Sequence, residues 1–326
     1  SRGLGDVYKR QIYGFSATKE KICEEYLFHY PKGSKAQVFK RTGQEFSFIQ
    51  NKAFKQLISK AVAENQLYFS VANTMNESVC TEAMKFFTES IVFSREFEDI
   101  PGQIRFNYNN NNVLKSMKQY AQRADVGIID MKFDMKNTEI DVDDTIPENA
   151  PPELSRALKS FVSALSDNSQ AKIQRNEIKA RTYHTGVNKK GELGQYELSL
   201  EDESDGTHRL MALAPAIDRV IDNGGIFVAD ELEKGLHPLL TEYIVNKFQN
   251  SEINKNHAQL IFTTHDTEIM RQHFLDADQF YFVDKDRQTG ESELYSVDGL
   301  GKKSNADIRT GYLIGKFGGI PELGDE

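Results

Sequence analysis

The chain has 326 residues and a formal net charge of -9. This length suits about two domains and leaves ample material for buried cores. The acidic balance argues against a surface built as a whole to hold nucleic acid, although a local basic groove is compatible with it. No apolar run approaches the roughly 20 residues that span a bilayer, and no charged-then-apolar leader opens the sequence. A cytosolic protein without a membrane partner is therefore expected.

Two cysteines, Cys23 and Cys80, occur in the sequence. They lie far apart and lack the paired spacing of zinc sites or of a secreted disulfide framework. We therefore expect both to be buried or inert thiols.

Residues 1–11, SRGLGDVYKRQ, lack an initiator methionine and resemble translated adapter sequence of the kind that contaminates metagenomic data. An ordinary frayed terminus, or the start of a domain fragment, is the alternative. Under either interpretation we expect the native chain to begin further upstream. Residues 1–11 are accordingly treated as a non-native leader.

Residues 12–50 have the pattern of a mixed sheet edge. The pattern predicts a short strand at IYGF and an amphipathic helix around Tyr26. Two short strands joined by a turn at Thr42 and Gly43 are expected to follow.

Residues 51–180 are predicted to form a mainly helical insertion, with one strand-like stretch at LYFSVAN and a last helix over 152–180. Ahead of that helix, an acidic cluster invites a calcium assignment. The spacing excludes it, because Ile146 stands where the turn glycine of a calcium loop belongs. The acidic cluster consists of Asp141, Asp143 and Asp144.

The basic residues of the last helix could touch phosphates, but a solvated helix face is favoured.

Residues 181–326 are predicted to form the lobe that carries the chemistry. Alternation over 182–200 with a glycine turn at 189–194 predicts a hairpin. Its last strand, YELSL, leads into EDESDGTHRLMAL, a polar loop followed by a helix. Ser204 is a candidate helix cap, and Gly206 lets the backbone approach a ligand closely. Amides at a helix N-terminus form an anion site, although plain capping is commoner for this pattern.

In GGIFVADELEKGLHP, residues 226–229 are an apolar run typical of a buried parallel strand, and Asp230 and Glu231 follow directly. Ligands collect at the carboxyl ends of strands in open α/β sheets. Such a pair suits Mg²⁺ binding by Asp230 and activation of an attacking water by Glu231, with the side chains on opposite sides of an extended backbone. The alternative is an acidic strand end facing water. Pro238 is expected to open the next helix.

A second buried-strand run, AQLIFTTHDTEIM, ends in Thr264, His265 and Asp266. A lone histidine after a strand is more often structural. This one lies one strand and one helix downstream of the Asp-Glu pair, a position from which His265 can reach a γ-phosphate.

SDGT at the head of a helix, then FVADE, LEKGLHP and FTTHD, resembles the signature, Walker B, D-loop and switch-histidine order of ABC-type ATPase heads. The resemblance is closer to the AAA/ABC-type ATP-binding proteins of prokaryotic abortive-infection and phage-defence loci. YGFSATKEKICEEYL, QVFKR, FYFVDKD and YLIGKFGGIP extend it over about residues 12–321. It implies an α/β fold, an ABC-type P-loop NTPase head with a mainly helical insertion. By this resemblance, residues 12–50 would be the remnant of the N-terminal ATPase lobe, and residues 181–326 would form the lobe with the signature, Walker B and switch histidine.

The resemblance implies ATP and Mg²⁺ as ligands. Asp230 would hold Mg²⁺, Glu231 would be the catalytic base and His265 would sense the γ-phosphate. Nucleotide held by a second subunit would be contacted by Ser204, Gly206, Thr207 and Arg209. The D-loop would include Gly235, Leu236 and His237. A homodimer through the nucleotide interface follows from that arrangement.

The Gly-rich Walker A loop, GxxxxGK[ST], occurs nowhere in the sequence. PKGSK at 31–35 lacks the upstream glycine. GLGKKS at 299–304 has lysine where Ser or Thr belongs, and it follows the switch histidine. We therefore expect an incomplete head that lacks its Walker A lobe, in an N-terminally truncated chain that is inactive by itself.

The leading hypothesis is an ATP-hydrolysing, dimerising switch subunit that works with a separate effector protein in phage defence. A DNA-repair or chromosome-maintenance ATPase is the second hypothesis, but it predicts long heptad arms that the sequence lacks. A non-catalytic regulatory binding module is the third, and the absent P-loop favours it. Nucleic-acid binding is possible, but nothing in the sequence supports it.

Overall fold

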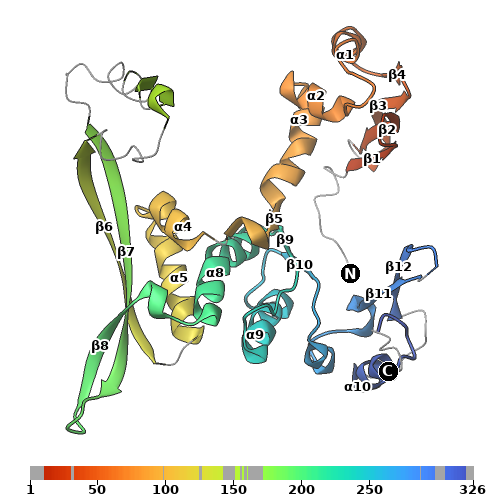
Figure 1. The fold of residues 1–326 in the computed structure, drawn as a ribbon. Helices are drawn as coiled ribbons and strands as arrows, with labels where there is room; N and C mark the ends of the chain where they lie inside the picture. Colours follow the sequence, from red (N-terminus) through yellow and green to blue (C-terminus); the bar gives the residue numbers. More distant parts are fainter. Residues whose placement is uncertain are drawn as a thin grey trace. The chain divides into compact units, whose positions relative to one another are not determined.

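A computed structural model describes the chain as two compact units, Ser1–Ile91 and Val92–Glu326 (Figure 1). Most of the predicted leader, the acidic cluster beyond Asp141 and the GLGKKS segment lie outside the described residues. The described residues are 11–30, 33–97, 99–124, 127–141, 151–154, 156–157, 160, 172–286, 288–297 and 305–320.

The first unit opens with a four-stranded antiparallel sheet in chain order. Its strands are β1 (Gln11–Ala17), β2 (Ile22–His29), β3 (Ala36–Thr42) and β4 (Glu45–Ser47). The predicted helix around Tyr26 is wrong, because this stretch is strand β2. Its burial alternates, with Glu25 and Leu27 inside, a period of two that the apolar residues alone do not reveal. The predicted turn is confirmed, with Gly43 at φ 56° between β3 and β4.

Three helices, α1 (Lys52–Ser59), α2 (Tyr68–Thr74) and α3 (Ser78–Lys85), share a core with this sheet. A π-helical turn, η2 (Phe86–Ser90), follows. The predicted strand at LYFSVAN is wrong, since Tyr68–Thr74 is helix α2. The carboxylate of Glu25 accepts hydrogen bonds from the amides of Tyr68 (2.7 Å) and Phe69 (2.9 Å), so a residue on β2 caps this helix. A local pattern cannot show a cap from so far along the chain.

Buried charges join the sheet to the helices of this unit. Glu25 and Arg41 are both fully buried, with Arg41 Nη1 3.5 Å from Glu25 Oε2. Arg41 also donates to the carbonyls of Gly43 (2.6 Å) and Gln66 (2.5 Å). Tyr13 donates its hydroxyl to Glu25 at 3.1 Å. The charges thus satisfy backbone groups around them as well as each other, as buried ions must.

The core of the second unit surrounds a three-stranded sheet in the order β10-β9-β5. The strands are β5 (Ile91–Phe93), β9 (Ile226–Ala229) and β10 (Gln259–Phe262), and β9 pairs with β10 in parallel. Helices α8 (Asp205–Asn223) and α9 (Pro238–Gln249) supply most of the buried apolar side chains. The predicted strand at 226–229 and the helix start at Pro238 are confirmed. A 3-10 turn, η3 (Ser94–Phe97), leads to α4 (Ile100–Asn107) and α5 (Asn111–Ala124), which pack on α8.

A long antiparallel ribbon extends from this unit (Figure 1). It contains β6 (Ile128–Asp141), β7 (Lys172–Val187) and β8 (Leu193–Ser199), in the order β6-β7-β8. The predicted hairpin over 182–200 is confirmed. The predicted helix to Ala180 is wrong over Lys172–Ala180, which is strand. Its polar residues favour helix locally, but pairing with β6 along the strand overrides that preference. The insertion therefore combines helices with this ribbon.

The chain beyond β10 forms a small two-stranded sheet with its own core. Two 3-10 turns, η5 (Thr267–Arg271) and η6 (Ala277–Gln279), precede β11 (Tyr281–Lys285) and β12 (Ser292–Ser296), and α10 (Asn305–Leu313) follows. β11 and β12 pair antiparallel. Among the described residues, none of the helices combines the length and apolar character needed to cross a membrane.

Removal of the buried carboxylate is expected to destabilise the first unit strongly. Glu25→Ala leaves the buried Arg41 without its counter-ion and the first amides of α2 without their acceptor. The free energy of unfolding, measured by urea titration, should therefore fall by about 3 to 5 kcal/mol. Glu82→Ala is the control, because its ion pair with Lys85 is exposed and the loss of such a pair should cost about 1 kcal/mol or less. A fall in Glu25→Ala no larger than in the control would contradict the capping role.

The two thiols are expected to differ in reactivity. Burial, together with the neighbouring Glu77, raises the pKa of Cys80, whereas Cys23 is only half-buried. Because the thiolate is the reactive form and a raised pKa keeps the thiol protonated at pH 8, iodoacetamide should label Cys23 well before Cys80. Peptide mass spectrometry over a time course measures both rates, and equal rates in the folded chain would disprove this assignment.

Candidate functional site

The predicted Walker B residues lie at the carboxyl end of β9, beside the end of β10. Thr263, the residue after β10, donates its hydroxyl to Asp230 Oδ1 at 2.6 Å and accepts the amide hydrogen of Glu231 at 2.9 Å. Its backbone continues the strand pairing, donating to Ala229 at 3.0 Å and accepting from Leu232 at 3.1 Å. One hydroxyl therefore holds both acidic residues. Sequence reasoning missed Thr263, although the parallel register of the two strands places it beside Asp230.

The chain turns sharply at Glu231, which has φ 46°. An extended backbone was expected here, and that expectation is wrong for Glu231. The left-handed conformation is costly for a residue with a Cβ, and such strain is found mainly at functional sites. Glu231 Oε1 lies 3.7 Å from His265 Nε2, and both side chains are open to solvent. The structure thus brings the predicted base and the predicted switch histidine together.

Glu233 links this turn to the switch histidine. Its Oε1 accepts the backbone amide of His265 at 2.7 Å, while Oε2 is buried without a hydrogen-bond partner among the described residues. Glu233 also belongs to the turn itself, since its carbonyl accepts the amide of Leu236 at 2.8 Å. Sequence reasoning did not select Glu233, because a third acid beside an Asp-Glu pair gives no signal of a distant backbone contact.

The predicted D-loop is a compact turn between β9 and α9. Gly235 has φ 73°, a conformation that favours glycine. Leu236 is buried in the core, whereas His237 is exposed at the start of α9. His237 Nδ1 accepts the amide of Leu239 at 3.2 Å, so this histidine caps the helix that Pro238 begins.

The predicted signature lies at the N-terminus of α8. Ser204 caps the helix by accepting the amide of Thr207 at 3.2 Å, as expected. The Thr207 hydroxyl is buried and forms a hydrogen bond of 2.9 Å with Ser204 Oγ. A Cβ at Gly206 would lie 2.9 Å from the carbonyl oxygen of Gly235. Gly206 is therefore needed for packing, and it brings the signature against the D-loop of the same chain. Arg209 is half-buried one turn further on.

The acidic groups fit a magnesium ion that is shared with phosphate. Among the described residues, no cluster of three or more His, Cys, Asp or Glu side chains could hold a metal ion by itself. Mg²⁺ in nucleotide sites takes one or two carboxylates and completes its shell with phosphate oxygens and water. Asp230 is exposed at the strand end, with one oxygen fixed by Thr263, which suits that kind of ligand.

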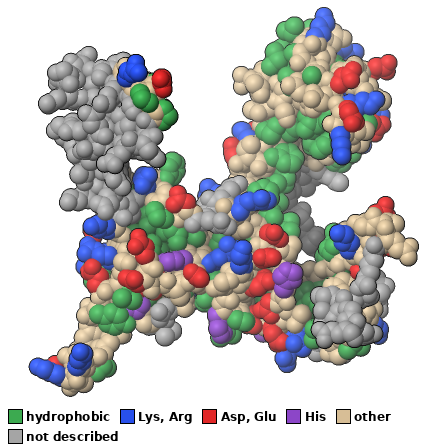
Figure 2. Space-filling view, in the orientation of Figure 1, with side chains coloured by type: hydrophobic (Ala, Val, Ile, Leu, Met, Phe, Trp, Pro, Cys, Tyr) green, Lys and Arg blue, Asp and Glu red, His purple; other side chains and the backbone are tan. Residues whose placement is uncertain are grey.

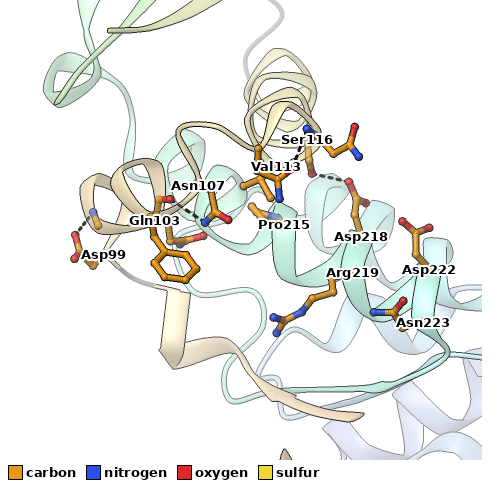
Figure 3. A pocket seen from close by; sticks show the side chains of 14 residues that line it. Asp99, Gln103, Asn107, Val113, Ser116, Pro215, Asp218, Arg219, Asp222 and Asn223 are labelled. Atoms are coloured by element: carbon orange, nitrogen blue, oxygen red, sulfur yellow. Dashed lines mark hydrogen bonds between the residues drawn. The ribbon is translucent and has the colours of Figure 1, made fainter. Parts of the chain in front are cut away.

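A separate groove of about 750 Å³ lies among α4, α5 and α8 (Figure 3). At its wall, Asp218 accepts hydrogen bonds from Ser116 (2.5 Å), Tyr120 (2.8 Å) and Lys247 (2.7 Å). Burial and the neighbouring Asp218 raise the pKa of Tyr120, so its hydroxyl remains a donor. These contacts join α5, α8 and α9. None of the predicted nucleotide residues lines this groove.

A match to a family model relates the chain to known proteins. Residues 9–271 match the family model described as "AAA domain, putative AbiEii toxin, Type IV TA system". The match covers most of the chain, which therefore belongs to this AAA-domain family. It is thus related to nucleotide-binding ATPases.

No curated protein matches the chain. Among solved structures, the recombination mediator protein RecF with ATP, from the RecFOR pathway, is similar over 78% of this chain and 74% of that chain. The sequence identity is 12% and the TM-score is 0.23.

The backbone strain at Glu231 can be measured directly. Because glycine adopts the left-handed conformation at little cost, Glu231→Gly should be more stable than Glu231→Ala by about 1 kcal/mol. Urea unfolding measures the difference in unfolding free energy between the two variants. Because both variants lack the carboxylate, the effect of removing it is the same in each. An alanine variant at least as stable as the glycine variant would show that the turn is unstrained.

Proposed function

We propose that this protein is an ATP-binding and ATP-hydrolysing switch subunit that forms an ATP-dependent homodimer in the cytosol. We further propose that it serves an abortive-infection, or phage-defence, system together with a separate effector protein. The observation that carries the enzymatic part is the arrangement in which Thr263 holds Asp230 and Glu231, with His265 3.7 Å from Glu231. The description of its family as AbiEii-like supports the defence part.

In this proposal the strand ends perform the chemistry. Asp230 is the magnesium carboxylate, and the bound ion would neutralise charge on the phosphates. Glu231 lies on a turn that projects its carboxylate into solvent, where it can orient a water and accept its proton. His265 Nε2 is close enough to Glu231 for both to face the same phosphate. Glu233 limits the movement of His265 by holding its amide.

The signature residues contact nucleotide on a second subunit in this proposal. Ser204, Gly206 and Arg209 lie in or next to the first turn of α8, where backbone amides favour an anion. Thr207 contributes by fixing the Ser204 hydroxyl. Because Gly206 packs on Gly235, the signature of one subunit and its D-loop form a single surface. A twofold dimer would place two such surfaces against two nucleotides.

A phosphate-binding loop is the remaining requirement, and the open edge of the sheet indicates where it would attach. Within the described residues, β10 is an edge strand, and Ile261 on it is 56% exposed. Parallel strands are normally paired and covered on both faces. We propose that a strand carrying the Walker A loop pairs with β10, from the part of the native protein upstream of this sequence. Without such a strand, the non-catalytic binding module becomes the better description.

The sequence upstream of Ile12 in the source DNA tests this proposal first. An open frame encoding a Gly-rich GK[ST] loop would support it, whereas an authentic start codon near Ile12 without that loop would refute it. The present chain should show no ATP turnover and only weak ATP binding by calorimetry. Several charge-assisted bonds to phosphate are absent, each worth roughly 1.5 to 3 kcal/mol. Turnover by this chain, abolished in Glu231→Gln, would contradict the need for an upstream loop.

The complete gene product gives the second test. Glu231→Gln keeps the size of the side chain but removes the base, so ATP should hold this variant as a dimer while hydrolysis stops. Size-exclusion chromatography with light scattering, with and without ATP and Mg²⁺, measures the association. Glu242→Gln, a substitution in α9 away from the proposed site residues, is the control and should behave as the wild type. A Glu231→Gln variant that remains monomeric with ATP would exclude the ATP-dependent dimer.

A further inference from the structure

The side chain of Glu203, the residue before the Ser204 cap, is buried within an otherwise exposed polar loop. Its side chain is 3% exposed, whereas Asp202, Ser204 and Asp205 are exposed. A carboxylate is rarely buried unless another group satisfies it. The proposed signature segment therefore has an anchored residue at its start, and that residue is not needed to cap the helix.

The anchor is on the ribbon. His184 of β7 places Nε2 2.7 Å from Glu203 Oε1, and the Thr182 hydroxyl donates to the same oxygen. Thr182 and His184 are two residues apart, so they lie on one face of the strand, and both are buried. The His184 ring stacks on Tyr196 of β8 with centroids 5.3 Å apart and an interplanar angle of 18°. The imidazole is thus held at Nε2 by Glu203 and on one ring face by Tyr196.

The connection between the ribbon and α8 is short. Strand β8 ends at Ser199, a single 3-10 turn (Leu200–Asp202) follows, and Ser204 begins the cap of α8. The Leu200 carbonyl accepts a hydrogen bond from the amide of Glu203 at 3.1 Å and contacts the His208 ring. The signature segment is therefore tied to the ribbon through Glu203 and to the 3-10 turn through His208. At the far end of the β7–β8 hairpin, Figure 2 shows basic side chains exposed to solvent, in the region of Lys189 and Lys190.

We infer that His184 and Glu203 are positioning residues that hold the signature segment against the ribbon, so that Ser204 and Gly206 meet the nucleotide of the second subunit in a fixed geometry. The inference rests on the proposed function of that segment. Neither residue touches nucleotide in this scheme. Their effect is on nucleotide affinity, because they determine where the helix N-terminus lies. They should have little effect on the hydrolysis step at Glu231.

Two substitutions of His184 separate positioning from packing. His184→Phe keeps a ring to stack on Tyr196 but removes the donor to Glu203. His184→Gln keeps a donor near the place of Nε2 but removes the ring. In the complete gene product, His184→Phe should raise KM for ATP about tenfold, the effect of one lost charge-assisted bond, with kcat changed less than twofold. His184→Gln should restore KM to near the wild-type value. An unchanged KM in His184→Phe, or a glutamine variant as impaired as the phenylalanine variant, would overturn the inference.

Hydrogen exchange on the present chain gives a readout that does not depend on ATP. The amides of residues 206–209 should exchange about tenfold faster in His184→Phe than in the wild type, and near the wild-type rate in His184→Gln. Thr182→Val, which removes the second donor to Glu203, serves if His184→Phe does not fold. Unchanged exchange in a folded donor-deleted variant would refute the anchor itself. Faster exchange in a complete protein that does not hydrolyse ATP would instead retain the anchor and refute the proposed function.

Discussion

The parallel pairing of β9 with β10 is the constraint on which the proposed site depends. It places Thr263 beside Asp230 and Glu231, so that one hydroxyl fixes a carboxylate and an amide on the neighbouring strand end. The same pairing brings His265 to Glu231 and lets Glu233 hold the switch backbone. The apolar faces of α8 and α9 bury one side of the two strands and make this register stable. The positions of Asp230, Glu231 and His265 relative to one another therefore follow from the register of β9 and β10.

Sequence reasoning predicted strand β9 and the helix starts at Ser204 and Pro238 correctly because their signals are local. Apolar runs that end in polar residues predict strands, and Ser204 and Pro238 mark helix starts through their own backbone chemistry. The second such run forms β10 as predicted, but its expected burial is wrong, because Gln259 and Ile261 are exposed. Thr263 and Glu233 escaped notice since each acts through a contact some thirty residues away in sequence. No pattern within either segment reports that contact.

The errors in predicted secondary structure have the same cause. The stretch around Tyr26 and the polar segment Lys172–Ala180 satisfy helical preferences locally, yet both are strands because long partners pair with them. The helix Tyr68–Thr74 was assigned as strand because its cap, Glu25, belongs to another element. When a segment contacts a partner that is distant in sequence, the composition and periodicity of the segment alone do not predict its structure.

Within the described residues, β10 lies at an open edge of its sheet. An open edge can pair with the wrong partner. An edge strand with exposed apolar residues such as Ile261 offers its backbone to any extended segment nearby, including the same edge of another copy. Natural sheets usually protect such edges with charge, proline or a bulge, and the QLIF sequence of β10 has none of these. A strand paired with β10, as proposed above for the Walker A loop, would cover these backbone groups. While the edge is empty, aggregation competes with assembly.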